Sequence, residues 1–211
     1  MRKTAIFLGF TAALLSSSAT AGEIRKVGGC WIRPGTVCTR MNLKGIDLRN
    51  ADLAKAQLSR SNLAGANLRS ATLTEANLTR TNLRGAQLEG AVLRGAELDG
   101  ANLTGASLAN ADLTHAGLQS AFLRSTDMSG ATLRDADFLL AELGFADLKD
   151  ADMQGASFRG ANLMGATLTG ADMRRVGFTN ADLRGANLTG ALAAGAIFIN
   201  AATDNCIGCP D

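Results

Sequence analysis

The sequence predicts an all-β protein, a four-sided parallel β-helix of about eight coils. Three observations lead to this fold class. Residues 41–200 follow a five-residue cycle that runs 32 times without an insertion or a deletion. Each cycle has an apolar residue at its centre and a small residue two positions earlier. Unusual residues within these cycles recur at intervals of twenty.

The cycle reads AxLxx, as in Ala51-Asp52-Leu53. Leu fills 24 of the 32 central positions, and Ala fills 26 of the positions two residues before them. Residues two apart in an extended segment point to one face, so both side chains are expected to point inward. The remaining positions hold Gly, Asn, Ser, Thr, Asp or Arg, which are typical of turns and solvated surfaces. Each cycle is therefore one short side and one corner, and it can bury its apolar pair only by stacking on other cycles.

The interval of twenty indicates how many sides form one coil. Phe occupies the central positions 138, 158, 178 and 198, and Asn precedes the central Leu at 42, 62, 82 and 102. A twenty-residue recurrence over a five-residue unit predicts four sides per coil, with like residues stacked in ladders. At roughly 4.8 Å between stacked strands, eight coils give a rod roughly 38 Å long.

The cycle resembles the A(D/N)LXX motif of the pentapeptide-repeat family over about three quarters of the chain. The resemblance implies a right-handed, four-sided β-helix in which the Ala and the central residue point inward. The motif is architectural and brings no catalytic residue with it.

Residues 1–21 are expected to be a signal peptide. Arg2 and Lys3 precede an apolar run over residues 5–15, and small residues follow up to Ala21. This order is typical of export signals, and it predicts cleavage after Ala21 and a periplasmic or secreted protein. The apolar run is too short for a membrane span, and no later stretch is continuously apolar, so no membrane span is expected.

Residues 22–40 break the five-residue rhythm and are predicted to be an N-terminal cap, because a solenoid needs an end piece over its first coil. Trp31 is expected to cover the apolar interior there. Cys30 and Cys38 can form a disulfide in an oxidising compartment, and we hypothesise that this bond staples the cap.

Residues 201–211 are predicted to be a C-terminal tail that contains Cys206 and Cys209 in a CxxC arrangement. A structural disulfide is the favoured interpretation. A redox-active pair and a metal or intermolecular bridge are the alternatives. Thiol–disulfide catalysts place this motif at the start of a helix that lowers one thiol pKa, and the sequence predicts no helix here.

The charge balance excludes one function of the family. Loss of Arg2 and Lys3 lowers the formal net charge from +2 to 0, and residues 41–200 hold 16 acidic against 15 basic residues. Some pentapeptide-repeat proteins bind DNA gyrase because they resemble duplex DNA in shape and acidity. This chain has no acidic stripe, so we expect neither DNA mimicry nor attraction to nucleic acid.

The sequence also argues against catalysis. Its single His115 lies at an outward corner, there is no Tyr, and no inserted loop could form a pocket over the repeats. Two aspartate pairs, Asp152 with Asp172 and Asp127 with Asp147, should stack, but each falls short of the six to eight oxygens that calcium prefers. We therefore expect no catalytic residue, no cofactor and no metal site.

The most informative departures from the cycle are apolar residues at outward positions. Clustered exposed apolar residues mark contact surfaces, which predicts docking of a protein partner or of a second copy in a homodimer. Alternatively, the two phenylalanines cover an irregularity where Ser125 and Phe145 replace a corner Gly. A second apolar group near the last coil could serve in capping or end-to-end dimerisation. The interaction patch is Phe122, Leu139, Leu140, Phe145 and Met164, and the second group is Leu192, Ile197 and Ile199.

Two functional classes follow. The favoured one is a non-enzymatic periplasmic scaffold, a rigid rod that binds protein through the apolar patch. The alternative is a redox- or metal-responsive protein that works through its terminal cysteines.

Overall fold

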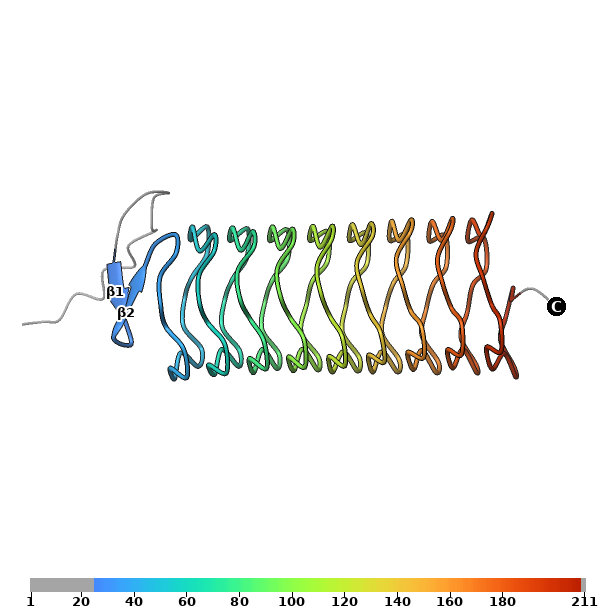
Figure 1. Ribbon diagram of the computed structural model, residues 1–211, viewed down its shortest axis with the longest axis horizontal. Coiled ribbons are helices and arrows are strands. Elements are labelled where there is room, and N and C mark those ends of the chain that lie inside the picture. The colour runs from blue at the N-terminus through green and yellow to red at the C-terminus, as the bar shows by residue number, and fades with distance from the viewer. Residues whose placement is uncertain (1–24, 210–211) are drawn as a thin grey trace, which may run out of the picture.

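The computed structural model describes residues 25–209 as a straight four-sided β-helix with a small hairpin at its N-terminal end (Figure 1). The hairpin consists of β1 (Arg25–Val27) and β2 (Cys30–Ile32), which pair antiparallel. The predicted signal peptide, residues 1–21, lies outside the described residues. No helix of the described part of the chain is long and apolar enough to cross a membrane.

Each side of the rod pairs in parallel with the side twenty residues further on, through the residue just before the central one. These bridges confirm four sides per coil and define four faces. Face 1 contains Asn42 and Asn62, face 2 contains Asp47 and Asn67, face 3 contains Asp52 and Thr72, and face 4 contains Gln57 and Asn77.

The rod is filled by the two inward residues of each cycle, as predicted. Leu48 and Ala56 are fully buried, like nearly all their counterparts along the rod. The rings of Phe138 and Phe158 stack with their centroids 4.5 Å apart, and the stack continues through Phe178 to Phe198. The core therefore leaves no room for an internal ligand along this stack.

Three inward positions of residues 41–200 hold hydroxyl residues in place of Ala. The hydroxyls of Thr81 and Thr126 each donate to the carbonyl of a central Leu one coil earlier, at 2.9 Å. The Ser61 hydroxyl donates in the same way to the Cys38 carbonyl, at 2.6 Å. These bonds satisfy the buried oxygens, which explains why polar residues are tolerated inside the rod.

The residue at each corner adopts a left-handed backbone conformation, with φ of 60° at Phe145 and 65° at Gly165. A corner side chain leans over the corner one coil further on. A Cβ added at Gly165 would lie 2.7 Å from the Phe145 ring, and one added at Gly160 would lie 2.9 Å from Leu140. Phe145 and Leu140 are thus accommodated because the next corner is glycine.

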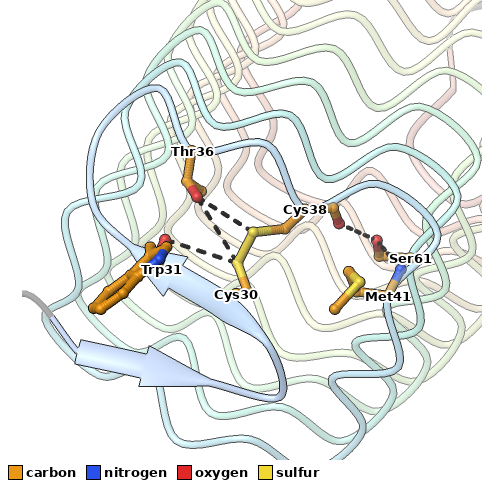
Figure 2. The surroundings of a disulfide bond; sticks show 6 residues. All are labelled: Cys30, Trp31, Thr36, Cys38, Met41 and Ser61. Carbon is orange, nitrogen blue, oxygen red and sulfur yellow. Dashed lines mark hydrogen bonds between the residues drawn. A yellow bond between two sulfur atoms is a disulfide. The ribbon is translucent and has the colours of Figure 1, made fainter.

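The N-terminal end is closed by the hairpin and the predicted disulfide between Cys30 and Cys38 (Figure 2). Cys30 and Ile32 point inward, and the tight turn at Gly28 packs against Leu43. The Thr36 hydroxyl lies 3.3 Å from Cys38 Sγ.

The prediction that Trp31 covers the interior is wrong. Trp31 lies between the two inward residues of β2, so the alternation of the strand turns it outward, and 49% of it is exposed. Its ring points away from the disulfide (Figure 2) and carries the Lys26 ammonium 5.6 Å from its centroid.

The β-helix extends beyond the predicted bounds at both ends. Val37 already bridges Gln57, which places Cys38 at a central inward position. At the other end, Ala202 and Ile207 bridge the preceding coil, so much of the predicted tail belongs to the rod. Cys206 and Cys209 form the second disulfide.

Candidate protein-interaction surface

Face 1 changes character halfway along the rod. Its ladder begins with asparagines, and the Asn62 side-chain amide donates to the Asn42 oxygen at 3.2 Å. In the fifth coil Phe122 takes the same position, between Asn102 and Glu142, and half of it is exposed. The backbone of Phe122 keeps the regular pairing, so the change affects the surface and leaves the coil intact.

Phe145 lies at the edge between faces 1 and 2, and 53% of it is exposed. Its ring covers Gly165, and the Arg124 guanidinium lies 5.1 Å from the ring centroid, within cation–π range. The Phe145 N–H donates to the Met164 carbonyl at 2.9 Å. The exposed ring is thus held in a defined place.

A surface hollow of about 330 Å³ lies on face 1 beside Phe122. Arg124 and Glu142 place opposite charges at its rim, and the Asn162 amide donates to Glu142 Oε2 at 2.9 Å. An apolar centre with a polar rim is the usual arrangement of a protein-binding surface. The residues that line the hollow are Thr104, Phe122, Arg124, Glu142, Gly144 and Asn162.

The two leucines of the predicted patch lie apart from this hollow. Leu140 is exposed at the opposite edge of face 1, where face 4 ends. Leu139 lies on face 4 and is half-buried, and its N–H donates to Asp137 Oδ1 at 3.0 Å. Leu140 therefore flanks the apolar surface of face 1, whereas Leu139 contributes little to it.

Sequence reasoning selected the apolar residues and missed the polar residues of the hollow. Thr104, Arg124 and Gly144 are stacked at intervals of twenty on face 1, so the spacing that revealed the four sides also places them together. From here on we call Phe122, Arg124, Glu142, Phe145 and Met164, with Leu140 at the flank, the face 1 patch.

The other candidate groups are paired on the surface. His115 is exposed at its corner, with Nδ1 4.0 Å from Asp135 Oδ2. Asp152 and Asp172 do stack, but Arg134 Nε lies 2.6 Å from Asp152 and Arg174 donates to Asp172 at 2.6 Å. The Arg174 hydrogen bond is the main reason that the pKa of Asp172 is lowered. Within residues 25–209 no three His, Cys, Asp or Glu side chains gather in a way that could hold a metal.

The two disulfides differ in burial. Cys30 and Cys38 are buried, whereas Cys206 and Cys209 are half-buried at the last coil. The described part of the chain contains no free cysteine. It also contains no helix, so the CxxC arrangement lacks the helix start that activates such a thiol.

A filled, uninterrupted four-sided β-helix with its variation confined to the surface defines a solenoid of the pentapeptide type. The sequence confirms this class: the family described as pentapeptide repeats matches in eight copies, over residues 35–69, 71–109, 106–139, 141–180 and 178–202. The chain belongs to the pentapeptide-repeat family, and its β-helix is right-handed.

Solved structures agree with this assignment. HetL, a pentapeptide repeat protein involved in heterocyst differentiation regulation from the cyanobacterium Nostoc sp. strain PCC 7120, is 34% identical. The match covers 81% of this chain and 86% of HetL, with a TM-score of 0.61. A trypsin-treated form of QnrB1, a plasmid-mediated fluoroquinolone resistance protein, is 21% identical over 76% of this chain and 82% of its own, with a TM-score of 0.62. The second likeness shows the fold alone. A comparison with curated proteins returned no match.

Proposed function

We propose that this protein is a non-enzymatic, exported scaffold that binds a partner protein through the face 1 patch. The observation that carries the proposal is the exposed apolar cluster of Phe122, Phe145 and Met164 on a rod whose other outward positions are mostly polar. Large exposed apolar groups beside a hollow with a polar rim are typical of contact surfaces.

Two features support export. The sequence of residues 1–21 is typical of a signal peptide. All four cysteines are paired in disulfides, which form and persist in oxidising compartments such as the periplasm. The relation to HetL is consistent with a regulatory or structural role carried out by binding.

Site-specific crosslinking tests the docking surface. A photoreactive amino acid at position 122 should give a crosslinked product in cells, whereas the same residue at position 92 should not. Val92 is a matched control because it occupies the equivalent ladder position on face 3 and is also apolar. Equal crosslinking at the two positions would contradict a dedicated surface on face 1.

Substitutions distinguish the proposed scaffold function from the alternative, a redox- or metal-responsive function of the terminal cysteines. Leu140→Asp and Phe122→Asp should abolish the crosslinked product or the activity in cells, because a charge placed in an apolar interface is costly to desolvate. The Cys206→Ser/Cys209→Ser double variant should leave both intact. The reverse result would favour a redox or metal response at the C-terminal end. Light scattering then shows whether the bound partner is a second copy.

A further inference from the structure

Three arginines stack along one edge of the rod, where face 4 meets face 1. Arg40, Arg60 and Arg80 are the corner residues of successive coils, with φ of 55°, 59° and 55°. The N–H of each donates to a carbonyl of the next coil at 2.9–3.0 Å, so the three corners are fixed in register. Their backbones are therefore spaced by one strand separation, about 4.8 Å.

Within residues 25–209 these arginines form no ion pair, in contrast to others on the surface. Arg69, for example, lies 3.1 Å from Glu89, and Arg184 lies 2.6 Å from Asp182. The reason is local composition. The adjoining sides of faces 4 and 1, residues 36–45, 56–65 and 76–85, contain five basic residues and no Asp or Glu.

Nothing in the fold requires this arrangement. Gly fills many of the corners, and a side chain at such a backbone conformation is strained. Like charges stacked on neighbouring strands also repel one another. Three consecutive arginines along one edge are unfavourable on both counts, and an anion lying against them would offset the charge repulsion.

A hollow of about 490 Å³ runs along the same edge. Its lining includes the three arginines, three hydroxyl-bearing residues of face 4 and one asparagine. No aromatic residue lines it. The lining residues are Thr39, Arg40, Ser59, Arg60, Asn77, Thr79 and Arg80.

The basic edge ends after the third arginine. The next corner is Gly100, over which Arg80 leans, with Cγ 3.4 Å from an added Cβ. The neighbouring Asp99 reverses the charge, and its Oδ1 accepts the N–H of Gln119 at 2.9 Å. The hollow is thus a bounded site about three coils long.

We propose that this edge binds a linear acidic polysaccharide that carries one carboxylate on each sugar, a polyuronate, laid parallel to the rod axis. Arginine matches carboxylates through paired N–H donors, and each pyranose ring is about as long as the strand spacing of about 4.8 Å that separates the arginines. The hydroxyls of Thr39, Ser59 and Thr79 can bond the sugar hydroxyls. The row of three arginines is about as long as three consecutive uronate units.

Nucleic acid fits this edge less well. Phosphates along one strand of duplex DNA rise by about 3.4 Å, which does not match the strand spacing. Single-stranded nucleic acid is usually held by aromatic side chains that stack on the bases, and the lining of the hollow contains none. The site also lies on earlier coils than Phe122, so it is separate from the face 1 patch.

Binding of galacturonate oligomers to the purified protein, measured by calorimetry, tests the proposal. The trimer should bind at least tenfold more tightly than the monomer, and the methyl-esterified trimer, which lacks the charges, should not bind. Affinity should fall as salt rises, because the contacts are ionic. Equal binding of the charged and esterified trimers would overturn the proposal, as would equally tight binding of a DNA oligonucleotide at the same salt.

Arg60→Gln should weaken trimer binding at least tenfold, and Arg175→Gln should change it less than twofold. Arg175 is a matched control because it is also a corner residue with positive φ, at 61°, and forms no ion pair with another residue of the described chain, but lies on a different edge. Equal losses from the two substitutions would mean that only net charge matters, which contradicts a built site.

Arg60→Gly distinguishes a binding role from a structural one. Glycine suits the left-handed corner and removes the repulsion between stacked charges, so this variant should unfold at a higher temperature than the parent. It should nevertheless lose trimer binding at least tenfold. Lower thermal stability together with unchanged binding would assign Arg60 to the fold and overturn the proposed site.

Discussion

The two ends of the rod differ in how well their apolar interior is covered. At the N-terminal end a hairpin folds over the first coil, and the buried Cys30–Cys38 disulfide holds it there. At the C-terminal end no hairpin within the described residues lies over the last coil, and Phe198 is only partly buried. The outward side chains of that coil are also apolar and exposed: Leu192, Ile197, Ile199 and Ile207.

Because of this difference, the two ends of the rod are not equally able to pair with another chain. A sealed end cannot add strands, whereas an open coil presents unpaired backbone groups and apolar side chains that favour pairing with another chain. The predicted second apolar group is therefore exposed at the end where a second copy could dock, and Ile207 adds to it.

The largest expected difference lies in the phenylalanine stack. Phe158→Ala should lower the free energy of unfolding by about 3–5 kcal/mol, because the ring is fully buried. Phe198→Ala should cost about 1–2 kcal/mol, because the same ring at the open end is only partly buried. Urea denaturation measures both. Equal costs would mean that the C-terminal end is covered in solution.

The two disulfides should also differ. Cys38→Ala should cost about 3 kcal/mol, because it opens the longer loop and removes a buried side chain. Cys209→Ala should cost at most about 2 kcal/mol, since its loop is shorter and its side chain is half-buried. Thermal unfolding with and without reductant measures both losses of stability. A greater loss from Cys209→Ala than from Cys38→Ala would contradict a firmly closed N-terminal end and an open C-terminal end.

Hydrogen exchange should reveal the same gradient without any substitution. Amides of the last coil, around Leu192 and Ile197, should exchange at least about tenfold faster than those of Leu43 and Leu48, because the end of a stack opens locally. Mass spectrometry of peptides from the two ends measures this. Similar protection at both ends would contradict an open C-terminal coil.

Acid should produce the smallest effect. Hydrogen bonds from Arg174 and Arg184 lower the pKa of Asp172 and of Asp182, both in the last two predicted coils. A folded-state pKa below the unfolded value means that the stabilisation is complete above about pH 4 and is lost as the pH falls through the lowered pKa. Each pair is partly exposed, so the loss should be below about 1 kcal/mol.

The control for this prediction is the Asp172→Asn/Asp182→Asn double variant. It should be slightly less stable at pH 7 and should lose less stability on acidification than the parent. An identical pH dependence in the two proteins would show that these ion pairs do not contribute.

The fold was predictable because it depends on which positions of the five-residue cycle are buried. Any residue at the central position faces the interior, so the ladder of Leu and Phe specified the inward side and the number of faces. The five-residue pattern could not be recognised at the two ends of the rod. Cys38 holds a central position and Cys206 holds an Ala position, and both were interpreted as parts of a cap or a tail.

Surface features were predictable only in part. Phe122 and Phe145 stood out because apolar residues are rare at outward positions, but exposure depends on neighbours, and Leu139 proved half-buried. Trp31 was misplaced because strand alternation, rather than hydrophobicity, decides which way it points. The arginine edge between faces 4 and 1 was not predicted. Acidic and basic residues were counted over all four faces together, and in that total a local excess of arginine does not show.

The stacking of residues twenty apart distinguishes two kinds of change in the length of the chain. Adding or removing one five-residue cycle between Phe122 and Glu142 would preserve the core, but it would rotate every later residue by a quarter turn and separate Phe122 from Glu142, Gly144 and Asn162 of its hollow. Adding or removing twenty residues would keep every face aligned. The unit of folding in this protein is therefore five residues, whereas the unit in which its surface can be lengthened without losing its pattern is twenty.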